Sequence, residues 1–293
     1  MISILGELIG RGSDGDVYKL EENKIIKFIN KEKINFLAFF ILLYLKSLYL
    51  TGAHQIEVNE KNIKIVQDQA QCDLADLLKS NKKLRFGDKI KYIRQVIMGV
   101  YFLNSYNIIH GDIKPNNILL FNDILKLTDY GLARDCKFNQ NSRRRKLYTI
   151  NYRPPECNDF CYSLKSDIWA LGCTIYEIYY GQKYFLIDGN GNLYHLACIE
   201  ERKKENQYIN KIIKMMLRDN SEERINIDKV AEYFTIPLIK NKHNLFVKNI
   251  WFKEDPNFIR CVYSRNENDD EFCNEKVLKE IIEDYKFKIF NII

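Results

Sequence analysis

The sequence predicts an α+β protein with two lobes, a small β-rich lobe followed by a larger, mainly helical one. In the first 70 residues, short runs alternate between apolar and polar residues and are separated by glycines and polar turns, as in half-buried strands. From Cys72 onward, apolar residues recur at three- and four-residue spacing, as in amphipathic helices. The 293 residues are enough for both lobes to bury a hydrophobic core.

We place the first lobe at residues 1–70 and expect five strands and one helix in it. The alternation predicts strands near residues 4–9, 16–20, 24–28, 54–58 and 62–67. Between the third and fourth strands, residues 36–50 are almost entirely apolar. A membrane-spanning helix needs about 20 apolar residues in succession. This stretch is shorter, so we interpret it as a buried helix and expect no transmembrane span.

The second lobe is expected at residues 71–236. Helical periodicity places Ile93, Ile97 and Val100 on one face, and residues 168–180 are nearly all apolar, which predicts a helix buried on all sides. Two short strands are expected near residues 118–120 and 125–127. The pattern weakens beyond, so we assign residues 237–293 to a C-terminal extension of unknown role.

Composition bounds the function without identifying it. With 46% hydrophobic and 29% charged residues, wholesale disorder is excluded. The net charge of +6 is small, and it gives no reason to expect nucleic acid as a partner. Eight scattered cysteines and a start without a secretory pattern predict an intracellular, cytoplasmic location. Richness in Ile, Asn and Lys hints at an AT-rich genome, and a viral chain would act in the cytoplasm of its host.

A glycine-rich turn lies between the first two expected strands, with the sequence Gly10-Arg11-Gly12-Ser13-Asp14-Gly15-Asp16-Val17. Glycines let main-chain amides approach phosphate oxygens closely, although a plain hairpin uses glycine too. The strand that follows favours a phosphate-covering hairpin over a dinucleotide-binding turn, which needs a helix there. In the third strand, Lys27 points inward by alternation and is placed to hold the α- and β-phosphates of a nucleotide.

The strongest signal is the stretch His110-Gly111-Asp112-Ile113-Lys114-Pro115-Asn116-Asn117-Ile118-Leu119-Leu120. It sets Asp112, Lys114 and Asn117 on one loop between apolar runs. Twelve residues after Asn117 comes Asp129-Tyr130-Gly131. Three polar residues in a turn could lack any chemical role, but the presence of a second motif at this spacing argues against that interpretation.

In this order, the motifs resemble those of the eukaryotic protein kinase superfamily over about residues 1 to 236. The resemblance implies a bilobal kinase fold in which Asp112 is the catalytic base and Lys114 steadies the transferring phosphate. It also implies that Asn117 and Asp129 hold two Mg²⁺ ions. Lysine at position 114 is similar to the serine/threonine branch, and Thr149 supports the same branch.

The resemblance further implies an ATP site, with a hinge near residues 68–70, Gln67 at the gatekeeper position and Leu119 under the adenine ring. The expected ATP-binding residues are Ile9, Gly10, Gly12, Gly15, Val17, Lys27, Asp68, Ala70 and Leu119. Two structural features are also implied. Asp167 is expected to brace the backbone of the catalytic loop, and Arg224 is expected to pair with Glu156.

The chain departs from the family pattern at several positions. The small-lobe glutamate that pairs with the strand lysine should fall 18 or 19 residues after Lys27, where Leu45 and Lys46 stand instead. Glu32 is an alternative partner, but it reads more simply as an acidic residue in a first helical turn. Gly111 replaces an arginine before the catalytic aspartate. Tyr130 replaces a phenylalanine of similar bulk, which we expect to be tolerated.

Two function hypotheses follow. The first is an active serine/threonine kinase that transfers the γ-phosphate of Mg-ATP to hydroxyls of protein substrates. The second is a pseudokinase that binds nucleotide or partner proteins, docking them on the apolar helix at 36–50 or on the C-terminal extension. A small-molecule phosphotransferase ranks third. The basic run at 142–146 fits recognition of acidic substrates, a phosphorylation site or a solvated loop.

Overall fold

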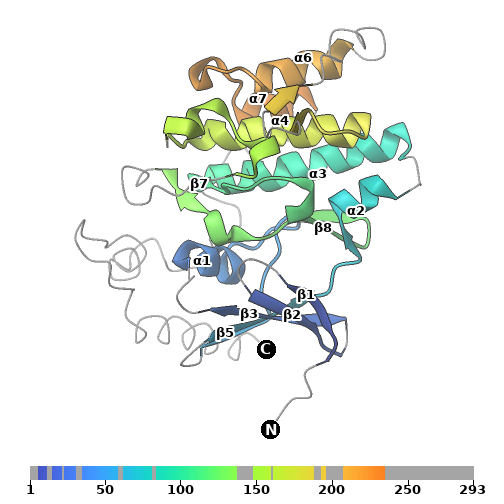
Figure 1. The fold of residues 1–293 in the computed structure, drawn as a ribbon, viewed down its shortest axis with the longest axis vertical. Helices are drawn as coiled ribbons and strands as arrows, with labels where there is room; N and C mark the ends of the chain where they lie inside the picture. The colour runs from blue at the N-terminus through green and yellow to red at the C-terminus, as the bar shows by residue number, and fades with distance from the viewer. Residues whose placement is uncertain are drawn as a thin grey trace, which may run out of the picture. The chain divides into compact units, whose positions relative to one another are not determined.

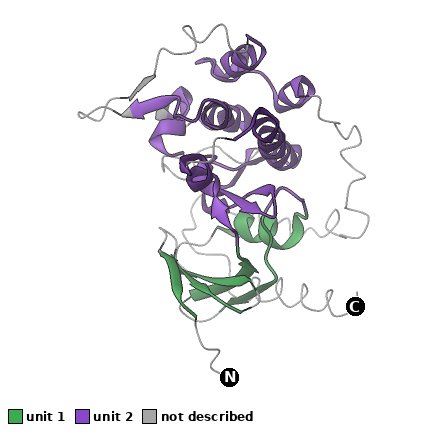
Figure 2. Ribbon diagram, turned by 90° about the vertical axis from the view of Figure 1, so that its right-hand side faces the viewer, with its two compact units in different colours: residues 1–46, 51–69, 243–293 green, residues 47–50, 70–242 purple. Residues whose placement is uncertain are grey.

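The structure is a computed structural model. It describes residues 6–11, 15–21, 23–30, 35–58, 62–80, 84–136, 148–159, 161–187, 193–195 and 207–234. Gly12, Glu32, the basic run 142–146 and the C-terminal extension 237–293 lie outside these residues. Figure 2 shows two compact units. Unit 1 contains the described parts of residues 1–46 and 51–69, whereas unit 2 contains residues 47–50 and the described residues from Ala70 onward.

A five-stranded antiparallel sheet forms unit 1, and its five strands confirm the prediction (Figure 1). The strand order is β1-β2-β3-β5-β4. The strands are β1 (Leu8–Arg11), β2 (Gly15–Lys19), β3 (Lys24–Asn30), β4 (Gln55–Val58) and β5 (Asn62–Asp68). At Gly15 a Cβ atom would lie 1.6 Å from the backbone oxygen of Phe28 in β3. Only glycine therefore permits this approach of the two strands.

The helix of unit 1, α1 (Phe36–Tyr44), begins after the cap Asn35, whose side chain accepts a hydrogen bond from the Leu37 amide. The predicted helix over 36–50 was too long. Beyond α1 the chain turns, and the Tyr49 oxygen accepts a hydrogen bond from the amide of Leu127 in unit 2. This backbone pairing replaces the helical hydrogen bonds that residues 47–50 would otherwise make.

The apolar side chains of α1 are mostly buried. The buried ones are Phe39, Ile41, Leu42, Leu43 and Tyr44. They form part of the core, so the docking surface that the second hypothesis places on this helix is not supported. Among the described helices, none combines the length and the apolarity needed to cross a bilayer.

In unit 2, α4 contacts both α3 and α6, and α7 packs on α3 (Figure 1). The helices are α2 (Leu74–Lys79), α3 (Phe86–Ser105), α4 (Leu164–Tyr180), α6 (Gln207–Met216) and α7 (Ile227–Tyr233). Every residue of α4 from Ser166 to Ile178 is buried, as the nearly continuous apolar run from Ile168 predicts. The helix begins with a capping box between Ser163 and Ser166 and ends at Gly181, which has a φ of 72°.

Short strands complete unit 2. A three-stranded sheet has the order β6-β8-β9, and the pairs β7-β10 and β11-β12 stand apart. Their bounds are β6 (Cys72–Asp73), β7 (Ile108–Ile109), β8 (Ile118–Phe121), β9 (Ile124–Leu127), β10 (Arg134–Asp135), β11 (Phe185–Ile187) and β12 (Leu193–His195). Both turn residues between β8 and β9, Asn122 and Asp123, have positive φ, which suits a two-residue hairpin.

The part of unit 2 that the structure describes also contains five short 3₁₀ turns: η2 (Pro115–Asn117), η3 (Tyr130–Leu132), η5 (Ile150–Tyr152), η6 (Pro155–Asp159) and η7 (Ser221–Glu223). Within the described residues, a β-rich unit with one helix and a mainly helical unit confirm the two-lobed α+β class that the sequence predicts.

Candidate active site

The loop that carries the predicted catalytic residues is anchored at both ends in unit 2. It leaves β7 at Ile109 and enters η2 at Pro115, before β8 begins at Ile118. Proline suits the start of a helical turn because its fixed φ fits there and its missing N–H is not needed. The apolar residues flanking the loop, Ile109, Ile113 and Ile118, are completely buried. The loop is therefore held in the core while its polar side chains converge.

These polar side chains converge on the carboxylate of Asp112. Its Oδ2 accepts hydrogen bonds from Lys114 Nζ at 2.7 Å and Asn117 Nδ2 at 2.9 Å. Its Oδ1 accepts from both the amide and the hydroxyl of Thr149, each at 2.9 Å. Lys114 Nζ also donates to the Thr149 hydroxyl at 2.7 Å. Asp112, Lys114 and Asn117 thus meet in one cluster, together with Thr149 from a separate segment.

Hydrogen bonding and charge keep Asp112 ionised. Burial raises the pKa of this carboxyl, but the hydrogen bond and charge of Lys114 and the hydrogen bonds of Thr149 together outweigh it, so the pKa lies below its ordinary value. An ionised aspartate at this position can accept a proton from a hydroxyl group or orient it.

Asn117 and Asp129 lie at the same end of the β8–β9 hairpin. Ile118 pairs with Leu127, and the Asn117 oxygen accepts a hydrogen bond from the Thr128 amide at 3.0 Å, directly before Asp129. Asn117 uses Nδ2 for both of its bonds to Asp112, which leaves its Oδ1 as the oxygen for a cation. Asp129 adopts a left-handed φ of 62°. A carboxylate and an amide oxygen are ligands that Mg²⁺ prefers, so this residue pair fits the ion.

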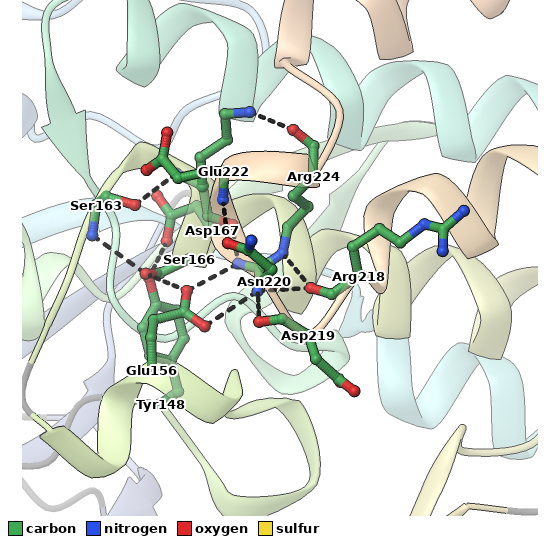
Figure 3. A network of polar contacts seen from close by, with 11 residues as sticks. Tyr148, Glu156, Ser163, Ser166, Asp167, Arg218, Asp219, Asn220, Glu222 and Arg224 are labelled. Carbon is green, nitrogen blue, oxygen red and sulfur yellow. Dashed lines mark hydrogen bonds and ion pairs between the residues drawn. The ribbon is translucent and has the colours of Figure 1, made fainter.

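A buried aspartate holds the backbone of the catalytic loop. Asp167 in α4 accepts hydrogen bonds from the amides of His110 at 2.7 Å and Gly111 at 3.1 Å. This confirms the predicted brace. Tyr148 donates its hydroxyl to the same carboxylate at 2.8 Å (Figure 3). Burial raises the pKa of Asp167, although these donors oppose the shift.

The predicted pair of Glu156 and Arg224 forms a second buried polar centre in unit 2 (Figure 3). The guanidinium donates to both carboxylate oxygens, at 2.7 and 3.0 Å. The Arg224 side chain is 0% exposed and also donates to the carbonyls of Lys165 and Arg218. Ser166, from the capping box of α4, donates to Glu156 at 2.9 Å. This pair joins η6 to the segment after α6 and has no contact with Asp112, which indicates a structural role.

The predicted phosphate-binding residues of unit 1 follow the register of its sheet. Gly10 pairs with Val17, Val17 with Lys27, and Lys27 with Ile65 of β5. Residues directly opposite one another share a face of a sheet, and Ile65 is 1% exposed. Lys27 is therefore on the face that carries buried residues, as the alternation predicts.

The remaining predicted ATP-binding residues are divided between the units. In unit 1, Ile9 is 45% exposed and the Asp68 carboxylate contacts His54 at 2.6 Å. The predicted gatekeeper Gln67 donates to the backbone oxygen of Gly52 at 2.9 Å. In unit 2, Leu119 in β8 pairs with Lys126 on one side and Asp73 on the other, and Ala70 precedes β6.

Two departures from the family pattern have structural outcomes. Leu45 is the buried C-cap of α1, and neither it nor Lys46 carries a carboxylate that could pair with Lys27. Tyr130 is 2% exposed and donates its hydroxyl to the Leu127 oxygen at 2.7 Å. The tyrosine is therefore accommodated, because its extra polar atom has an acceptor.

Sequence reasoning missed two tyrosines near the loop. One is Tyr148, at the brace. The other is Tyr152, which donates to Glu177 of α4 at 2.5 Å, and burial raises the pKa of both partners. Tyr148 lies outside every motif, and Tyr152 begins a segment, Tyr152 to Glu156, that fits the family pattern but does not predict the contact with Glu177. Only the predicted burial of α4 hints that its acidic residues need donors from elsewhere.

Comparisons with known proteins agree with this geometry. A model described as protein kinase domain matches residues 4–234. The dual specificity protein kinase TTK of Mus musculus is 27% identical over an alignment of 258 residues that covers 77% of this chain and 30% of the mouse protein. A probable cell division protein kinase of Encephalitozoon cuniculi is 29% identical over 258 residues, covering 78% of this chain and 95% of that protein.

A third relative, the probable serine/threonine-protein kinase mps1 of Dictyostelium discoideum, is 29% identical over 262 residues. That match covers 78% of this chain and 27% of the relative. The chain thus spans less than a third of the mouse and Dictyostelium proteins but nearly all of the Encephalitozoon one. With a matching family model over most of its length and the predicted loop cluster in place, the chain belongs to the protein kinase domain family, within the eukaryotic-type protein kinase superfamily.

Proposed function

We propose that this chain is an active kinase that transfers the γ-phosphate of Mg-ATP to serine and threonine hydroxyls of proteins. The carboxylate of Asp112 carries the proposal, because four donors from Lys114, Asn117 and Thr149 fix it in one orientation and keep it ionised. A scaffold that only binds partners has no chemical need for this arrangement.

Each residue of the cluster has a proposed role. Mg-ATP supplies the phosphoryl group when bound. The acceptor hydroxyl oxygen forms a bond to the γ-phosphorus while the bond from that phosphorus to the β–γ bridging oxygen breaks, and Asp112 takes the hydroxyl proton. Lys114 stabilises negative charge at the transferring group. Asn117 and Asp129 would hold two Mg²⁺ ions, and Lys27 would hold the α- and β-phosphates.

Serine and threonine are the proposed acceptors because Thr149 joins the segment before η5 to both Asp112 and Lys114. The relative from Mus musculus is a dual specificity kinase by name, so tyrosine is the competing acceptor. The remaining parts of the proposal are the division into an N-lobe at 1–70, a C-lobe at 71–236 and an extension at 237–293, and a cytoplasmic location.

A pseudokinase is the second candidate, because Leu45 and Lys46 stand where the family places the glutamate that pairs with the strand lysine. One assay separates the candidates. Purified chain is incubated with labelled ATP, Mg²⁺ and a generic basic or acidic protein, beside Asp112→Asn and Lys27→Ala. A matched control is Asp123→Asn, in the exposed β8–β9 turn.

We expect transfer by the parent and by Asp123→Asn, and loss of transfer in the other two variants. Transfer that survives Asp112→Asn would refute the assignment of the base. A parent chain that binds nucleotide without transfer would establish the pseudokinase. Phosphoamino-acid analysis of the product tests the acceptor, since phosphotyrosine would contradict serine/threonine specificity.

A further inference from the structure

We propose that Tyr148 is a positioning residue for phosphoryl transfer, whose hydroxyl fixes Asp167 and thereby the loop that carries Asp112. This inference rests on the proposed function, since it concerns the same base. It assigns a role to a residue outside every motif of the sequence.

The carboxylate of Asp167 is where Tyr148 acts. Oδ2 accepts from the His110 amide, whereas Oδ1 accepts from both the Gly111 amide and the Tyr148 hydroxyl. Asp167 is 0% exposed, so water does not replace a lost donor. An anionic oxygen deprived of a donor in such a site is unfavourable, and the carboxylate or its remaining partners then have reason to shift.

Tyr148 is itself held by every polar group it has. Its amide donates a hydrogen bond to the main-chain oxygen of Gly111 at 2.8 Å. Its main-chain oxygen accepts hydrogen bonds from Arg153 Nε at 3.2 Å and Nη2 at 2.7 Å. The residue is 3% exposed and has a φ of 62°, in the left-handed region that non-glycine residues avoid. A conformation of this kind persists only where the surroundings fix it, and it often marks a functional site.

Because Tyr148 is next to Thr149 in the chain, one short segment contacts both the backbone of the catalytic loop and the carboxylate of Asp112. The next residue, Thr149, donates to Asp112 through both its amide and its hydroxyl. Tyr148 and Thr149 therefore hold the loop at two points, because Tyr148 binds the main-chain oxygen of Gly111 and Thr149 binds the carboxylate of Asp112. Gly111 has no side chain to anchor it and a φ of 81°, and its peptide groups are held by hydrogen bonds from its amide to the Asp167 carboxylate and from the Tyr148 amide to its oxygen.

The hydroxyl of Tyr148 is placed as a hydrogen-bond donor to Asp167. Burial, followed by the charge of Asp167, raises the pKa of Tyr148 well above its ordinary value, so the group keeps its proton. Removing this donor would loosen the loop, and small displacements of a catalytic group are costly because its geometry sets the barrier.

The test is Tyr148→Phe, which removes one oxygen atom and keeps the ring. The matched control is Tyr180→Phe in α4, where the hydroxyl donates to Asn210 of α6. In the transfer assay we expect Tyr148→Phe to lower kcat about tenfold, with the KM for ATP within about twofold of the parent. Tyr180→Phe should retain the kcat of the parent.

Amide hydrogen exchange provides the second readout and does not depend on turnover. In Tyr148→Phe, the peptide that contains the His110 and Gly111 amides should exchange about tenfold faster, with α3 and α4 unchanged. If the parent transfers no phosphate, the proposed function fails, and this exchange measurement still tests the grip on the loop. Unchanged kcat and unchanged exchange would overturn the inference, and so would an equal loss of protection across α3 and α4, since that indicates a general structural role.

A second variant keeps the test decisive if Tyr148→Phe does not fold. Arg153→Lys preserves the charge but cannot grip the Tyr148 oxygen with two donors. It should speed exchange at His110 and Gly111 in the same local pattern, by a smaller factor. A folded Arg153→Lys protein with parental exchange and kcat would contradict the proposal.

Discussion

The ion pair of Glu156 and Arg224 allows a quantitative test of the claim that it serves folding and not turnover. Arg224→Met keeps much of the side-chain volume and removes the charge. It breaks two hydrogen bonds to Glu156 and leaves the carbonyls of Lys165 and Arg218 without this donor. Breaking one partner of a buried pair costs about 3–5 kcal/mol, because the other charge remains in a site of low polarity.

For a domain of this size, each kcal/mol lowers the melting temperature by about 2–4 °C, so we expect a fall of about 10 °C. Urea unfolding followed by circular dichroism measures the free energy directly. The control is Lys229→Met, since Lys229 makes an ion pair of equal length with Glu232 on an exposed surface, and no resolvable change is expected. At a temperature where both proteins are folded, kcat/KM should stay within about threefold of the parent.

The double variant Glu156→Gln/Arg224→Met sharpens the test. Once the arginine is gone, Glu156 is a poorly compensated charge, so its neutralisation should restore part of the loss. The losses in free energy of unfolding measured for Glu156→Gln and for Arg224→Met should therefore sum to more than the loss measured for the double variant. The reasoning is refuted if Arg224→Met costs less than about 1 kcal/mol, or if the two losses simply add.

Three further outcomes are expected. Gly15→Ala should destabilise unit 1 and weaken nucleotide binding, because its Cβ would overlap a carbonyl of the neighbouring strand. A Cβ at Gly87 would have nothing within 4 Å, so Gly87→Ala should be tolerated. Thermal melting curves compare the two variants. Burial raises the pKa of Asp112, but its hydrogen-bond donors lower the pKa by more, so the folded pKa lies below the unfolded pKa of about 3.9. The difference in free energy of unfolding between the parent and Asp112→Asn should therefore hold above the unfolded pKa and be lost as the pH falls through the folded pKa. Urea titrations across pH 3 to 7 check that sign. In peptide mapping of the folded protein, the exposed Cys161 should react with a thiol reagent, while the buried Cys157, whose pKa burial raises, should not.

Most of the fold could be predicted from the sequence wherever an element was long enough to repeat its pattern. The five strands of unit 1 and the uniformly apolar helix α4 repeat their side-chain period several times. The strands β7 and β10 have two residues each, which is too short for any period. The end of α1 was missed for a different reason, since its terminus depends on a backbone bond to Leu127, far along the chain.

The candidate site divides in the same way. Asp112, Lys114 and Asn117 were found because they lie within one short loop, where spacing along the chain and proximity in space coincide. Thr149 and the Tyr148 amide reach that loop from 35 or more positions away, so their contacts depend on tertiary structure. Asp167 was placed by resemblance, yet its third donor was not, because a tyrosine next to a threonine has no distinguishing pattern.

The segment at 47–50 limits how the protein can be dissected. Its backbone pairs with β9 at Leu127, and the Tyr49 oxygen lies against the position of Gly99 in α3. A fragment that starts at residue 70, where the helical unit otherwise begins, would leave the edge of β9 open and the Leu127 amide without its acceptor. In the intact chain, these four residues are synthesised well before the strand they complete. The helical unit therefore includes a peptide that lies, along the chain, between two stretches of unit 1, and attempts to express the helical unit separately should retain residues 47–50.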